Sequence, residues 1–177
     1  MKRDCNEDSD CRATIEHFGL EPLTVEGGLF RQTYVADESI AAEALPKRYG
    51  APRTFGSAIY YLLTSEPDSF SALHRLETDE IYHFYLGGPV EMLLLHPDRH
   101  GERIVLGPDV LGGQHVQFVV PRGVWQGSRL ICGGSFALMG TTMAPGFDLA
   151  DWAEGKRDAL VREYPEHAEL IRALARN

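Results

Sequence analysis

The chain has 177 residues, enough for one domain whose core needs no disulfide or structural metal. Acidic residues outnumber basic ones 26 to 17, and the net charge of −9 repels nucleic-acid phosphates and anionic lipids. No apolar run approaches the roughly 18 residues that span a membrane, and the polar N-terminus lacks a secretory signal. We therefore expect a cytoplasmic protein that binds neither nucleic acid nor membrane.

The N-terminal residues are the most polar part of the chain. Residues 1–11 are expected to form a flexible leader before a single domain over 12–177. Cys5 and Cys11 lie in this leader at a spacing that matches no common zinc motif, which leaves their role open. Cys132 lies in an apolar, strand-like run, where a thiol is expected to pack as a small hydrophobic group.

Helical patterns occur only at the two ends of the chain and in one polar stretch that interrupts its strand-like middle part. Apolar residues at helical spacing predict a short helix over 12–20. The polar stretch 36–53 predicts a long loop with a helical turn around 40–45. Near the C-terminus helical spacing returns, and Pro165 divides it into two short helices.

Between these ends the pattern is that of short strands. Glycine and proline clusters recur between residues 28 and 147 and separate segments rich in aromatic and β-branched residues. The segments are LFRQTYVA, SAIYYLLT, FSALHRL, EIYHFYL, VEMLLLH, RIVLG, HVQFVVP, SRLIC and FALMGTTMA. Regular turns without interleaved long helices predict an all-β domain, either a sandwich or a barrel.

The richest chemistry lies between residues 71 and 89. His74 and Glu80 flank a short turn, so a hairpin brings their side chains together. Strand alternation places Tyr82 and Phe84 on the same face as Glu80 and turns His83 to the other face. A buried carboxylate needs a partner, and His74 is the natural one.

The sequence resembles the cupin superfamily. Glu80 followed six residues later by Gly87 is similar to the end of its first motif, and Pro121 with Gly123 is similar to its second. One subfamily of small single-domain cupins of unknown function is similar in six ordered segments. They are VEGGLFRQTY, SAIYYLL, HRLETDEIYHF, VVPRGVWQG, TMAPGFDLADW and YPEH. The resemblance implies a double-stranded β-helix, or jelly-roll barrel, with short terminal helices, and a homodimer.

The chain departs from the metal-binding pattern of this superfamily. Ala72 and Gln126 stand where metal-binding cupins place histidines, and the spacing from His74 to Glu80 is one residue longer than usual. A metal would therefore have His74, Glu80 and Gln126 as ligands, a weak set for zinc or iron. No cofactor follows with certainty, and a divalent metal (Fe, Ni, Mn or Zn) stays open.

Three functions fit these residues. The first is a metal-independent epimerase, isomerase or lyase acting on a small polar molecule in the barrel. In this hypothesis His74 abstracts a proton, Glu80 orients the imidazole and Tyr82 donates a proton. Side chains expected to bind the ligand are Phe84, Gln117, Trp125, Gln126 and Arg31. Glu26 either supports a turn as an ion pair with Arg31 or reaches the ligand.

The other two functions keep the same barrel. A metal-dependent oxygenase would add His83 or His115 to the ligand set given above, although parity turns His83 outward. A binding or storage protein would hold a ligand without catalysis. The sequence leaves enzyme and non-enzyme both open.

Overall fold

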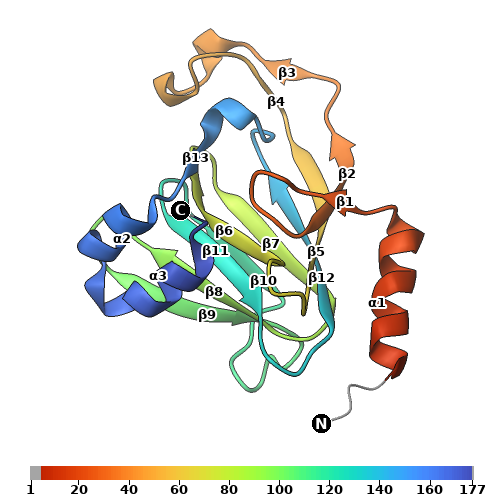
Figure 1. Ribbon diagram of the computed structural model, residues 1–177. Coiled ribbons are helices and arrows are strands. Elements are labelled where there is room, and N and C mark those ends of the chain that lie inside the picture. Colours follow the sequence, from red (N-terminus) through yellow and green to blue (C-terminus); the bar gives the residue numbers. More distant parts are fainter. Residues whose placement is uncertain (1–4, 177) are drawn as a thin grey trace.

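The computed structural model describes residues 5–176 and consists of two antiparallel sheets packed face to face (Figure 1). The strands of the six-stranded sheet are, in spatial order, β1 (Glu21–Pro22), β2 (Leu29–Val35), β5 (Ser57–Thr64), β12 (Phe136–Met143), β7 (Glu80–Gly87) and β10 (Gln117–Val120). The five-stranded sheet contains β13 (Trp152–Glu154), β6 (Phe70–Leu76), β11 (Trp125–Leu130), β8 (Val90–Leu95) and β9 (Gly101–Leu106). The predicted all-β class is confirmed.

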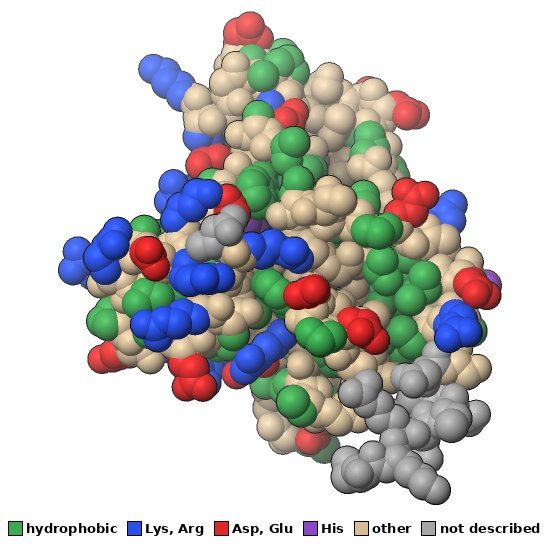
Figure 2. Space-filling model, in the orientation of Figure 1, with side chains coloured by type: hydrophobic (Ala, Val, Ile, Leu, Met, Phe, Trp, Pro, Cys, Tyr) green, Lys and Arg blue, Asp and Glu red, His purple; other side chains and the backbone are tan. Residues whose placement is uncertain are grey.

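The helices lie at the ends of the chain, as predicted. Helix α1 (Cys5–Phe18) packs outside the six-stranded sheet, and α2 (Arg157–Glu163) and α3 (Ala168–Leu174) pack outside the other (Figure 1). Pro165 begins the 3-10 turn η4 (Pro165–His167) between α2 and α3, which confirms the predicted division. Figure 2 shows Lys and Arg side chains gathered over these C-terminal helices.

Helix α1 begins earlier than the periodicity predicted. It starts at Cys5 rather than at residue 12, so part of the segment interpreted as a leader is helical; residues 1–4 lie outside the described residues. The apolar side chains Ile15 and Phe18 pack on the outer face of the six-stranded sheet. Packing of the second half of α1 on the sheet therefore stabilises the helical conformation of its first half, whose sequence has no apolar pattern.

Two local expectations are corrected. The 36–53 stretch holds η1 (Ala42–Ala44) near the expected turn, but also η2 (Lys47–Tyr49) and a small hairpin of β3 (Ser39–Ile40) and β4 (Arg53–Thr54). Cys132 is exposed, because β11 ends at Leu130 and the following residues form a turn.

The main core lies between the two sheets. Strand alternation in β7 turns Glu80, Tyr82 and Phe84 inward, where all three are buried, and leaves Ile81 and His83 on the less buried outer face. The predicted parity is therefore confirmed. Apolar side chains of β5, β7, β8 and β12 fill much of this interior, and the polar residues of β6, β7 and β11 interrupt it.

Candidate functional site

The polar residues of the interior come from both sheets. Gln126 pairs directly with His74 across the β6–β11 ladder, which places both side chains on the inner face. The Gln126 Nε2 atom donates a hydrogen bond of 2.8 Å to Glu80 Oε2 on the opposite sheet. His74, Glu80 and Gln126 are at most 7% exposed, so this bridge crosses the closed interior. Together with Tyr82 and Glu26, these residues form what we call the polar cluster.

Glu26 enters the polar cluster from the β1–β2 loop. Its carboxylate Oε1 lies 3.7 Å from His74 Nε2, and its backbone carbonyl accepts a hydrogen bond from the amide of Ala72. Gly27 follows with a positive φ of 103°, and a Cβ there would come within 2.3 Å of the Phe70 carbonyl oxygen. Only glycine fits this close approach, so the tight turn at Gly27 holds Glu26 near His74.

The orientation of His74 is set by its own strand. Its Nδ1 atom lies 2.8 Å from the carbonyl oxygen of Ala72. A carbonyl only accepts, so Nδ1 carries a proton and the neutral ring has its lone pair on Nε2. Nε2 is fully buried and has no hydrogen-bond partner among the described residues. The imidazole thus presents a bare basic nitrogen toward Glu26.

The expected contact between His74 and Glu80 is replaced by two other contacts. The hydrogen bonds and ion pairs of the described residues join Glu80 to Gln126 and His74 to Glu26. The two side chains still share the interior, since Gln126 donates to Glu80 and pairs with His74 across the β6–β11 ladder. Glu80 therefore does not orient the imidazole.

Burial raises the pKa of Glu80 above its ordinary value, and repulsion from the charge of Glu26 raises it further. His74 and the hydrogen bonds from Thr141 and Gln126 act in the opposite direction. Burial and the neighbouring Glu80 also raise the pKa of Tyr82 well above its usual range. The cluster therefore favours a protonated carboxyl group beside a neutral phenol.

Three side chains that the sequence assigned to the ligand lie elsewhere. Arg31 is exposed and donates to the carbonyl of Phe18, so it caps the end of α1. Gln117 is exposed on the edge strand β10, where its amide lies 3.3 Å from the His83 ring. Trp125 follows strand alternation to the face opposite Gln126, where it packs beside the C-terminal helices.

The two histidines considered as further metal ligands, His83 and His115, also lie outside the polar cluster. His83 contacts Thr142 and Gln117 on the outer sheet face, and His115 is exposed beside Phe118. Neither completes a ligand set with His74. Within residues 5–176, no three His, Cys, Asp or Glu side chains gather in an arrangement that would hold a metal ion.

Sequence reasoning missed one aromatic residue of the site. The Trp152 ring lies nearly parallel to the His74 ring, with centroids 6.4 Å apart and an interplanar angle of 18°. Its Nε1 atom is buried without a hydrogen-bond partner in the described part of the chain. Trp152 ends the segment TMAPGFDLADW, but no periodicity there indicates which element it faces.

A family model described as Cupin superfamily (DUF985) matches residues 12–154. The chain belongs to this family. The uncharacterized protein YML079W of Saccharomyces cerevisiae is 31% identical over 161 residues, which cover 85% of this chain and 79% of the yeast protein. The structure of protein SO0799 from Shewanella oneidensis is 30% identical with a TM-score of 0.79, and the match covers 93% of this chain and 96% of that one.

A hypothetical protein from Leishmania major has a similar structure, with a TM-score of 0.82 at 26% identity, over 94% of this chain and 98% of that chain. These full-length similarities confirm the cupin jelly roll and the subfamily resemblance. They name no ligand. Among the described residues of this cupin, no helix has the length and apolar composition needed to cross a bilayer. The predicted homodimer and cytoplasmic location stay predictions.

The raised pKa of Glu80 predicts a pH-dependent effect on the stability of this cupin. Folded Glu80 keeps its proton to higher pH than unfolded Glu80, whose pKa is about 4.3, so stability falls as pH rises through the folded pKa. Glu80→Gln removes this titration. We expect the unfolding free energy of the variant, relative to wild type, to increase from pH 4 to pH 8 in urea titrations. A difference that is constant or decreases with pH would contradict the assignment.

Proposed function

We propose that this cupin binds a small, neutral, hydroxyl-bearing molecule in the polar cluster and moves a proton on it, as an epimerase, isomerase or lyase does. The observation that carries the proposal is the buried Nε2 atom of His74, which has no hydrogen-bond partner within residues 5–176. A buried basic nitrogen without a partner is costly for folding alone, and a proton abstracted from a ligand would satisfy it.

The two carboxyl groups divide the remaining roles. Glu26, at 3.7 Å from Nε2, stabilises the imidazolium that forms when His74 takes a proton. Glu80, whose pKa is raised, is the proton donor, and Tyr82 beside it is kept as a neutral phenol. This assignment moves the supporting role from Glu80 to Glu26 and keeps His74 as the base.

The unpartnered atoms of the interior indicate the ligand class. In the part of the chain that the structure describes, they include Ser71 Oγ, Ser128 Oγ, Gln126 Oε1, His74 Nε2 and Trp152 Nε1. Ligand hydroxyl groups both donate and accept, so a polyol or sugar satisfies all of these atoms. An anionic reacting centre is disfavoured, since it would meet the Glu26 carboxylate.

Proton exchange tests this proposal directly. Neutral sugars and polyols are screened by thermal shift, and each compound that binds is incubated with the protein in D2O. We expect a neutral hydroxylated compound to bind and to exchange a carbon-bound hydrogen for deuterium, as read by proton NMR. Binding without exchange would leave only a binding or storage role, and no binding of any neutral compound would overturn the proposal.

The donor set of this cupin does not fit a resident transition metal. The Gln126 amide already donates to Glu80, Ala72 stands at an expected histidine position, and His83 faces outward. We therefore expect protein purified without chelators to hold far less than one equivalent of Fe, Ni, Mn or Zn per chain by elemental analysis. Stoichiometric metal that is lost in His74→Ala and Glu80→Ala would instead favour the oxygenase hypothesis.

A further inference from the structure

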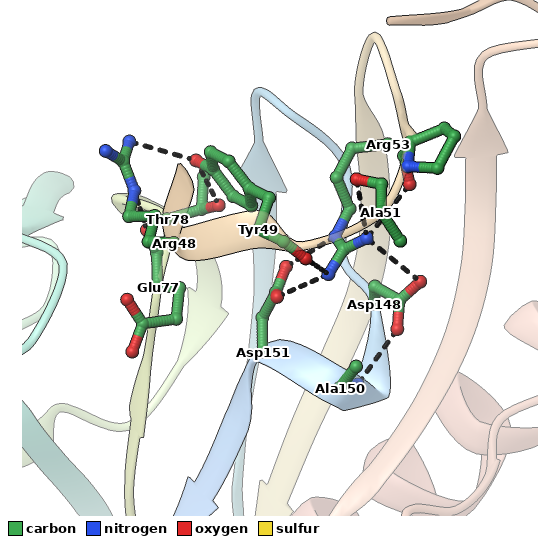
Figure 3. A network of polar contacts seen from close by, with 10 residues as sticks. Arg48, Tyr49, Ala51, Arg53, Glu77, Thr78, Asp148, Ala150 and Asp151 are labelled. Atoms are coloured by element: carbon green, nitrogen blue, oxygen red, sulfur yellow. Dashed lines mark hydrogen bonds and ion pairs between the residues drawn. The ribbon is translucent and has the colours of Figure 1, made fainter. Parts of the chain in front are cut away.

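A buried ion pair joins two distant segments near the polar cluster. Arg53, in β4, and Asp151, at the end of the 3-10 helix η3 (Leu149–Asp151), are 98 positions apart and 3% and 5% exposed. Nε and Nη2 of Arg53 donate to the two carboxylate oxygens at 2.7 and 2.6 Å. The hydrogen bonding with Asp151 raises the pKa of Arg53, although burial acts against it. We call this pair the clamp (Figure 3).

The remaining N–H groups of the Arg53 guanidinium bind the backbone of the preceding residues 49–52, which together with Arg53 we call the strap. They bind the backbone carbonyls of Tyr49, Ala51 and Pro52. Every N–H group of the guanidinium thus has an acceptor, which a lysine ammonium at the same position does not reproduce. Residues 49–53 are therefore held rigidly around the Asp151 carboxylate.

The same strap contacts the turn between His74 and Glu80. The Tyr49 hydroxyl lies 2.9 Å from the Thr78 hydroxyl, and Arg48 Nε donates to the carbonyl of Glu77 (Figure 3). Tyr49 and Thr78 are both buried. The turn between β6, which carries His74, and β7, which carries Glu80, is thus fixed to the strap that binds Asp151.

The clamp also determines where Trp152 lies. Trp152 directly follows Asp151 and is the first residue of β13, a strand of three residues that pairs with β6 up to His74. Little apolar burial holds this segment from the other side, because Phe147 and Leu149 are 41% and 58% exposed. The amides of Gly146 and Phe147 donate to the Thr54 carbonyl and to Ser57 Oγ, and the ion pair is the contact directly next to β13.

We propose that Arg53 and Asp151 are positioning residues of the site, which hold the Trp152 ring parallel to the His74 imidazole. The inference rests on the proposed function only in treating the His74 face as the place where the ligand reacts. Trp152 then lines the ligand site beside His74. The contact of two Arg53 nitrogens with both Asp151 oxygens sets the angle between the Trp152 and His74 rings. We expect a lysine at position 53 to keep the charge next to Asp151 but not to fix the orientation of the Trp152 ring.

Tryptophan fluorescence tests the clamp without any ligand. The chain has two tryptophans, so in a Trp125→Phe background Trp152 is the sole emitter. Trp125 lies outside the polar cluster, on the C-terminal helix face. In that background we expect Arg53→Lys and Asp151→Asn to shift Trp152 emission to longer wavelength and to increase its quenching by acrylamide. Unchanged emission and quenching in both folded variants would overturn the proposal.

Two controls separate positioning from general loosening. Arg129→Lys removes an exposed contact in which Nε and Nη2 both donate to Glu91 Oε2, and Leu62→Ala destabilises the cluster under α1. Neither is expected to change Trp152 emission below its unfolding transition. A shift in Leu62→Ala equal to that in Arg53→Lys would mean that the signal reports stability, which also overturns the proposal. Absence of deuterium exchange in wild type would remove the proposed function and leave this measurement valid.

Discussion

Replacing His74 by glutamine is expected to slow deuterium exchange into the substrate by about a hundredfold or more, because general bases contribute roughly 10²–10⁴ to rate. Glutamine is similar in length and keeps a hydrogen-bonding end, but it cannot accept the proton. The Nε2 atom that would do so is buried, 3.7 Å from Glu26, and makes no hydrogen bond to any described residue. The rate constant is measured by NMR at saturating ligand, with thermal shift confirming that the ligand still binds.

His83→Gln is the matched control for this substitution. His83 is also a β-strand histidine, but it bonds Thr142 on the outer face of the six-stranded sheet. Its replacement is expected to leave the exchange rate unchanged. Glu26→Gln is expected to give an intermediate loss, since the imidazolium would form without its counter-charge. Exchange in His74→Gln at the wild-type rate would exclude His74 as the base.

The part of the site that the sequence predicted is the part that local rules determine. Side chains alternate along a strand, so Glu80, Tyr82 and Phe84 share the inner face of β7. The same rule excludes having both Trp125 and Gln126 inside, because they are neighbours on β11. Applied to that strand, alternation would have removed Trp125 from the predicted ligand set without any structure.

The missed residues reach the site through contacts between distant segments. Glu26 arrives through the β1–β2 loop and Trp152 through η3 and β13, and neither position follows from a sequence period. A register shift between β6 and β11 further changes which β6 side chains face Gln126 and Ser128. Motif spacing alone therefore placed His74 and Glu80 in one interior but did not indicate that Glu26 and Trp152 lie beside His74.

The clamp is expected to be worth far more to stability than the ion pairs on the surface. Asp151→Ala leaves the buried Arg53 guanidinium with only the partly exposed Asp148 carboxylate, 3.8 Å away, as counter-charge among the described residues. Breaking a buried pair costs about 3–5 kcal/mol of unfolding free energy, and we expect a loss near the lower end of that range. Urea unfolding at pH 7 measures the loss. Glu91→Ala, which breaks the surface pairs with Arg129 and Arg103, is expected to cost about 1 kcal/mol or less.

A double substitution separates the ion pair's contribution to stability from its effect on geometry. Arg53→Met with Asp151→Leu removes both charges, so the cost of an unpaired buried charge disappears, and much of the lost stability is expected to return. Recovery stays incomplete, because the carbonyls of Tyr49, Ala51 and Pro52 lose their donors. If the double variant unfolds as easily as Asp151→Ala, the cost lies in packing rather than in the unpaired charge. If it regains stability but not the Trp152 signal, the ion pair serves position more than stability.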